Sequence, residues 1–215
     1  MVPAAVTRSL LGYGVLAGPF YLALGIGQGL FRDGFSFARH PLSVLANGPG
    51  GWVQTANLGV SALMVLAAVV GITRVAAAGS RVMRGALVIY ALGMIVAAIF
   101  RADPMDGFPP GTPLGVPTTI STTGLVHFAA GAVTFLAMAI ACFAGARTMA
   151  KRGETGLARL SLLTGLVVFL GFFGGSALAS SVGGVAGIWV AVVMGWAWLA
   201  VVSRYYYRVS ADPSC

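Results

Sequence analysis

Six long apolar stretches constrain this chain more than any other feature of its sequence. Away from their ends they contain no Asp, Glu, Lys or Arg, and most exceed the roughly 18 residues that a helix needs to cross a bilayer. They do not alternate between polar and apolar residues, which argues against membrane β-strands. We predict an all-α, polytopic membrane protein with a single six-helix bundle over residues 1–215. The predicted spans are residues 10–30, 52–73, 84–100, 124–145, 157–178 and 184–203.

The composition also favours a membrane protein over a soluble one. Of the 215 residues, 58% are hydrophobic and only 8% are charged, whereas soluble domains contain about 25% charged residues. Such a chain cannot cover its own surface with polar groups in water. The net charge of +8 does not indicate nucleic-acid binding, because the chain has no soluble basic domain to carry that function.

The cations are distributed unequally between the two sides of the predicted bundle. Of the 13 Lys and Arg, only Arg32, Arg39 and Arg101 fall on one side, which leaves ten on the other (13 − 3). Because cytoplasmic loops are enriched in Lys and Arg, we predict that the richer side and both termini are cytoplasmic. The protein is then a multi-pass protein of the plasma or inner membrane, and its basic rim should attract anionic lipid head groups.

Polar side chains gather on the opposite, outward side, where three segments of the chain meet. The first segment is the connection after span 10–30 together with the start of the next span. The second is the end of span 84–100, and the third is the start of span 124–145. Both histidines of the chain lie in these segments. The candidate ligand-binding residues are Arg39, His40, Ser43, Asn57, Arg101, Asp103 and His127.

Four short motifs in these segments resemble a known family. They are HPLS at 40–43, GGW-x-Q-x-x-N at 50–57, IFRADP at 99–104 and GLVHF at 124–128. In this order they resemble domain-of-unknown-function family 998, a group of small bacterial and archaeal membrane proteins. The resemblance covers nearly the whole chain and implies a six-helix bundle with a motif-bearing outer mouth, but no activity. The positions that it carries over by motif match are His40, Ser43, Asp103 and His127.

Two imidazoles and a carboxylate on one side of the membrane suggest a metal centre. His40, Asp103 and His127 form a ligand set that suits zinc or iron and leaves coordination positions open for water or substrate. The protein would then be a membrane-embedded hydrolase or transferase that acts on a lipid. Apart from this divalent metal, we expect no cofactor.

Two further hypotheses use the same residues without a metal. In the first, His127 is a general base, Ser43 is a nucleophile and Asp103 orients the imidazole. In the second, the polar groups only satisfy one another where the connections dip toward the bilayer.

The function that we carry forward is an outward-facing polar pocket that binds a lipid-like or small amphiphilic ligand. Membrane lipids are the expected partners. An accessory role in a larger complex stays open, because glycines four residues apart, such as Gly171 and Gly175, allow close packing against a partner helix or a second copy of the chain.

Overall fold

The fold is all-α. A computed structural model describes residues 4–75, 80–115 and 117–210, and these residues contain no β-strand. Six of the helices are long and apolar enough to cross a membrane, as the sequence predicts. The elements are α1 (Ala4–Leu30), the short 3-10 helix η1 (Leu42–Ala46), α2 (Trp52–Arg74), α3 (Arg81–Ile99), α4 (Thr122–Lys151), α5 (Thr155–Ala177) and α6 (Val182–Val209).

Each predicted span overlaps one of these long helices, but α1, α4 and α6 extend well beyond the predicted ends. The helix α4 contains 30 residues and is therefore about 45 Å long, whereas the hydrocarbon core of a bilayer is only about 30 Å thick. Its last turns carry Arg147 and Lys151, which are good helix formers. Apolar patterning marks where a helix crosses the hydrocarbon, and it misses the turns that continue into the polar boundary.

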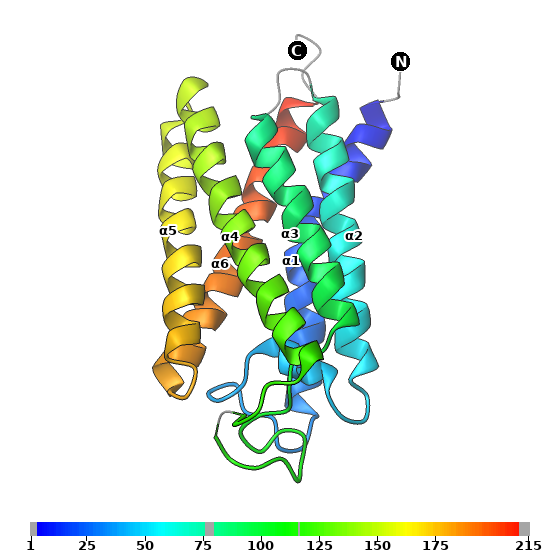
Figure 1. Cartoon of the computed structure of the whole chain (residues 1–215). Helices are drawn as coiled ribbons and strands as arrows, with labels where there is room; N and C mark the ends of the chain where they lie inside the picture. The colour runs from blue at the N-terminus through cyan, green and yellow to red at the C-terminus, as the bar shows by residue number, and fades with distance from the viewer. Residues whose placement is uncertain (1–3, 76–79, 116, 211–215) are drawn as a thin grey trace.

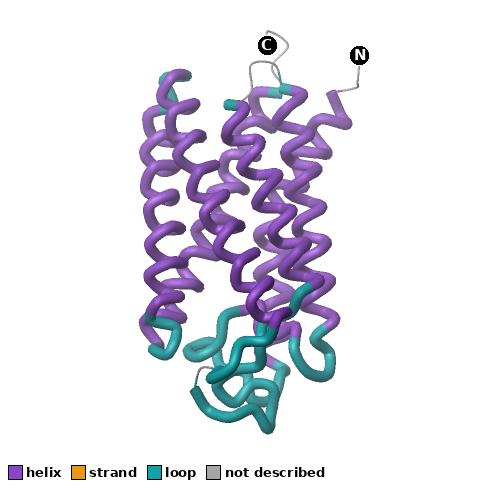
Figure 2. Tube along the Cα trace, in the orientation of Figure 1, coloured by secondary structure: helices purple, strands orange, loops and turns teal. Residues whose placement is uncertain are grey.

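The helices follow one another around a ring. Each long helix packs on the next one along the chain, and α6 returns to pack on α1. The start of α1 and the end of α6 lie at one end of the bundle, at the top of Figure 1, which we call the terminal end. The two long connections, residues 31–51 and 100–121, cover the opposite end, which we call the loop end (Figure 2).

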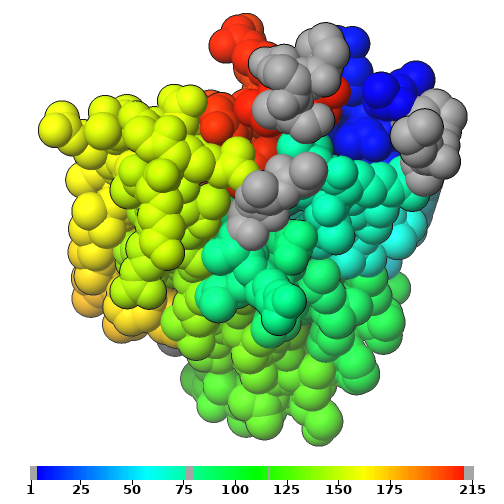
Figure 3. Space-filling model, turned by 90° about the horizontal axis from the view of Figure 1, so that it is seen from above, coloured from blue at the N-terminus to red at the C-terminus, as the bar shows by residue number. Residues whose placement is uncertain are grey.

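The terminal half of the ring has a filled centre. Trp198, Leu199 and Tyr206 of α6 are buried there with Met83 of α3, and the indole Nε1 of Trp198 donates a hydrogen bond of 2.8 Å to Ser161 Oγ. Seen from the terminal end, α1, α2 and α6 gather on one side and the corner between α4 and α5, in yellow, projects on the other (Figure 3). The centre of the loop half is packed differently, and the candidate site lies there.

Candidate functional site

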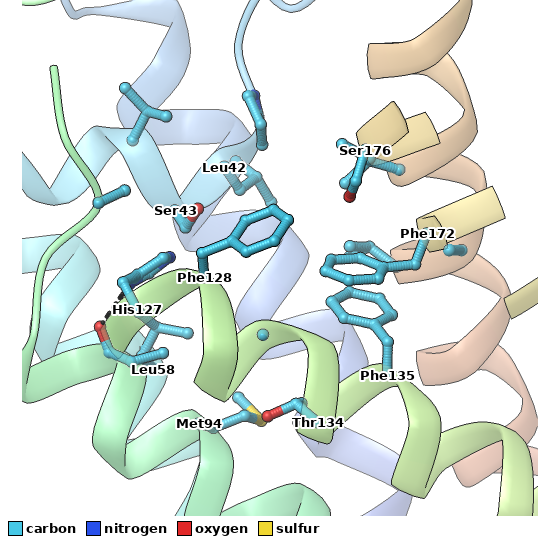
Figure 4. Close-up of a pocket in the computed structure, with 18 of the residues that line it drawn as sticks. Leu42, Ser43, Leu58, Met94, His127, Phe128, Thr134, Phe135, Phe172 and Ser176 are labelled. Carbon is cyan, nitrogen blue, oxygen red and sulfur yellow. Dashed lines mark hydrogen bonds between the residues drawn. The ribbon is translucent and has the colours of Figure 1, made fainter. Parts of the chain in front are cut away.

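A cavity of about 480 Å³ occupies the centre of the ring in its loop half. Residues from all six long helices, from η1 and from the second long connection line it. The walls are predominantly apolar. Besides two tyrosines, the polar side chains that line the cavity are those of Ser43, Asp103, His127, Thr134 and Ser176 (Figure 4).

The cavity is closed toward the terminal end by aromatic rings. Trp196 lines it and contacts Tyr21 and Tyr90, with ring centroids 5.2 and 5.7 Å apart. Small residues create the open volume on the loop-end side of these aromatic rings, which form the floor of the cavity. Gly131 and Gly195 line the cavity, and a Cβ atom on either would find its nearest neighbour at 3.4 Å, an ordinary contact distance. The site is therefore a chamber closed at its inner end.

The imidazole of His127 lines this chamber, and among the described residues only one of its two ring nitrogens has a hydrogen-bond partner. Its Nδ1 lies 2.8 Å from the carbonyl oxygen of Phe100 and 3.2 Å from that of Ala97, at the end of α3. A carbonyl only accepts, so Nδ1 carries the proton and donates. In the neutral imidazole Nε2 is then a hydrogen-bond acceptor. The imidazole is half-buried and lines the cavity at the same end as Ser43 (Figure 4).

Asp103 also reaches the cavity, but its carboxylate organises the start of α4. Oδ1 accepts a hydrogen bond of 2.5 Å from the hydroxyl of Ser121, and Oδ2 accepts one of 3.0 Å from the Ser121 backbone N–H. The Ser121 hydroxyl in turn accepts from the N–H of Gly124 and caps the helix. Asp103 does not contact His127 through any hydrogen bond in the described part of the chain, so it does not orient the imidazole as predicted.

His40 is a structural residue. Its side chain is fully buried, its Nδ1 accepts from the backbone N–H of Ser36 at 2.9 Å, and its Nε2 donates to the carbonyl oxygen of Asp106 at 3.0 Å. Its own carbonyl accepts from the indole of Trp189. Burial lowers the pKa of His40 below its ordinary value of 6.5, and the hydrogen bond to Asp106 offsets this only in part. A neutral His40 joins the two long connections.

The predicted metal centre is therefore not assembled. Both ring nitrogens of His40 are engaged with the backbone, and His40 does not line the cavity that Asp103 and His127 share. A metal ligand must offer a free lone pair. Within residues 4–75, 80–115 and 117–210, no three His, Cys, Asp or Glu side chains are placed to hold a metal ion.

The two candidate arginines do not line the cavity. Arg39 donates to the carbonyl oxygen of Asp106 at 3.1 Å and lies 3.7 Å from its carboxylate, with 41% of the Arg39 side chain exposed. It ties the two connections together. Arg101 is exposed at the surface. Neither residue is positioned to hold the polar end of a ligand inside the chamber.

Asn57 belongs to a buried network behind the cavity wall. Its side chain is 1% exposed, and Nδ2 donates to the Tyr21 carbonyl at 2.9 Å and to Gln54 Oε1 at 3.2 Å. Ser61 donates to Asn57 Oδ1 at 3.4 Å. The bond to Tyr21 joins α2 to α1 and the other two lie within α2, which accounts for Asn57 and Gln54, two of the polar residues that the sequence places near the mouth.

Of the seven candidate residues, the structure brings together Ser43, Asp103 and His127 at the cavity and places the other four outside it. It adds two hydroxyls that the sequence does not single out, Thr134 and Ser176. Both lie in apolar spans, where nothing distinguishes them from the structural hydroxyl of Ser161. The hydroxyl of Thr134 is buried and has no hydrogen-bond partner among the residues described.

A family model described as "Protein of unknown function (DUF998)" matches residues 15–205. The match includes both long connections and most of every long helix. The chain belongs to this family. The resemblance seen in the four motifs is thus confirmed, and the DUF998 description specifies no activity. No curated protein and no solved structure matches the chain.

Proposed function

We propose that this DUF998 protein binds a lipid-like or small amphiphilic ligand in the loop-end cavity. The carrying observation is the distribution of polarity along the chamber. Ser43, Asp103 and His127 lie toward the loop end, whereas the closed end is lined by the aromatic rings of Tyr21, Tyr90 and Trp196. A molecule with one polar end and an apolar body has the matching distribution. The cavity volume of about 480 Å³ is within the range of about 300–1,000 Å³ that is usual for ligand pockets.

The polar groups favour a hydroxyl over a phosphate as the polar end of the ligand. The Nε2 atom of neutral His127 accepts a hydrogen bond, Ser43 both donates and accepts, and Asp103 carries a negative charge. An anionic group would be repelled by this carboxylate, because like charges at short distance are unfavourable. The arginines that could attract a phosphate lie outside the chamber. We therefore propose an uncharged, hydroxyl-bearing polar end.

The charge distribution supports an outward-facing loop end. Only Arg32, Arg39 and Arg101 belong to the side of the predicted spans that corresponds to the loop end, and the other ten of the 13 Lys and Arg (13 − 3) belong to the side that corresponds to the terminal end. This excess of cations is expected for a cytoplasmic side. The protein is then a multi-pass protein of the plasma or inner membrane, and the chamber opens away from the cytoplasm. The ligand would meet the protein from the outer leaflet or from the outer aqueous phase.

Native mass spectrometry of the gently extracted protein tests this proposal. The cavity variant is Gly195→Leu, because Gly195 lines the chamber and an isobutyl group takes up space there. The matched control is Gly174→Leu, because Gly174 of α5 is exposed and a Cβ atom would meet nothing within 4 Å. His127→Ala removes the polar contact instead of the volume.

We expect the native protein and Gly174→Leu to retain a bound mass of the size of a small amphiphile. Gly195→Leu should lose it, and His127→Ala should retain markedly less. The size of the mass also separates a lipid from a metal ion. A bare protein in all four samples, or equal retention by all four, would contradict binding in this cavity.

A further inference from the structure

The helices α4 and α5 separate as they approach the loop end (Figure 1). In the terminal half they are in close contact, because a Cβ atom on Gly165 of α5 would lie 2.5 Å from the ring of Phe143 of α4. Farther along, the ring of Phe135 stacks on that of Phe172, with centroids 4.0 Å apart and planes 10° apart. This aromatic pair lies at the cavity wall.

Beyond the aromatic pair each helix packs on a different neighbour. His127 of α4 is hydrogen-bonded to the last turn of α3. Gly175 of α5 packs on α6, where its Cβ position lies 2.5 Å from the carbonyl oxygen of Gly184. The chamber continues between the two helices, since Phe128 of α4 and Ser176 of α5 both line it.

Phe128 marks an opening in the side of the bundle. It lines the chamber, and 56% of it is exposed, as expected where the chamber reaches the surface of the bundle. In Figure 4 its ring lies between the side chains of His127 and Ser43 and those of Ser176 and Phe172. Gly131, one turn deeper on α4, leaves the space beside Phe172 without a side chain.

This opening lies at the depth of the hydrocarbon. The helix α5 has 23 residues and a length of about 34 Å, close to the roughly 30 Å of the bilayer core. Phe172 is five residues before its last residue, Ala177 (177 − 172), or about 8 Å along the axis. The side of the bundle that exposes Phe128 therefore faces lipid chains.

We propose that the chamber receives one acyl chain of a bilayer lipid sideways, through the opening between α4 and α5, while the second chain stays in the bilayer. This inference rests on the proposed function and names the ligand class and its route. The polar head remains at the level of His127 and Ser43. Phe128 lies beside the chain where it crosses from the bilayer into the protein.

The dimensions of the chamber fit one chain and not two. A methylene group occupies about as much space as a water molecule, roughly 30 Å³, so a cavity of about 480 Å³ holds on the order of 16 of them. The chamber is also elongated. His127 and Met138 both line it and are 11 residues apart on α4 (138 − 127), which is about 17 Å along the axis.

Two tryptophans of α6 serve as a matched pair of reporters. Trp196 and Trp198 are 2% and 1% exposed, but only Trp196 lines the chamber. The protein is reconstituted into phosphatidylcholine vesicles that contain a diacylglycerol brominated near the methyl ends of its chains. Bromine quenches tryptophan emission only at short range. Comparison of the native protein with Trp196→Phe and Trp198→Phe assigns the quenching by difference.

We expect Trp196→Phe to lose most of the quenching that Trp52 and Trp189 do not account for, because of the two remaining tryptophans only Trp196 lines the chamber. Trp198→Phe should lose little of it. Gly131→Leu should abolish the Trp196 component by filling the opening, and the exposed control Gly174→Leu should preserve it. Helix content and unfolding temperature, measured for each variant, show whether the fold is kept.

A brominated monoacylglycerol separates failure of the route from failure of the binding site. If the monoacylglycerol quenches Trp196 and the diacylglycerol does not, the chamber binds an amphiphile but admits no chain that remains joined to the bilayer, and the sideways route is wrong. If neither lipid quenches Trp196, the proposed function fails as well. Quenching by diacylglycerol that persists in Gly131→Leu would also overturn the route.

Discussion

Replacing His40 with alanine should loosen the loop end far more than replacing His127. The imidazole of His40 accepts from the Ser36 N–H and also donates to the Asp106 carbonyl. In His40→Ala the Ser36 N–H loses that partner inside the protein, whereas the Asp106 carbonyl keeps its hydrogen bond from Arg39. A buried polar group left unsatisfied costs about 1–3 kcal/mol.

The packing of the ring adds to this loss. His40 contacts Phe35 and Phe108, with ring centroids 5.3 and 5.6 Å apart, and aromatic pairs contribute about 0.5–1.5 kcal/mol beyond buried area. Water that enters near the loop surface recovers part of the hydrogen bonding. We therefore expect a net loss of about 3 kcal/mol, which corresponds to an increase on the order of 100-fold in local opening.

Hydrogen exchange of the backbone amides in residues 31–51 measures this opening directly. His127→Ala removes a single donor from the end of α3 and should change exchange in this segment several-fold at most. His40→Gln is the matched rescue, because its amide can accept from Ser36 and donate to Asp106. Unchanged exchange in His40→Ala, or an equal increase in His127→Ala, would refute the division of the two histidines into a structural and a ligand-facing residue.

Two further predictions concern acidity and helix packing. The pKa of His40 in the folded protein is below its unfolded value of 6.5, so the unfolded chain binds the proton first as the pH falls. Stability should therefore fall as the pH drops below about 6.5 and level off below the folded pKa. The pH profile of the unfolding temperature should lack this component in His40→Gln. Gly14→Ala should destabilise the bundle by about 1–3 kcal/mol, because its Cβ would overlap the hydroxyl of Ser203 on α6, whereas Gly12→Ala, with nothing within 4 Å, should be neutral in the same thermal unfolding assay.

The sequence was sufficient to predict the six helices, because runs without charge have few alternatives in a bilayer. It also indicated the end of the bundle where polar residues gather. It could not assign those residues to roles. His40 and His127 look alike in a sequence, and only the path of the backbone determines that His40 meets two main-chain groups while His127 meets carbonyls on one side and a chamber on the other.

The chamber itself could not be predicted, because it depends on the angle between helices. Gly131 and Gly195 are two of 31 glycines, and most of the others either allow close helix contacts or face outward. Thr134 and Ser176 are isolated hydroxyls in apolar spans. They are cavity residues because α4 diverges from α5, and this divergence results from the packing of α4 on α3 and of α5 on α6.

A structure determined from crystals of the protein grown in a lipid phase tests most directly the claim that the chamber holds an amphiphile. We predict elongated density that runs from the level of His127 and Ser43 past Met138 to Trp196, and that leaves the bundle beside Phe128. A chamber that has collapsed, with Phe128 or Met138 turned inward to fill it, would contradict the proposal that this space holds an amphiphile.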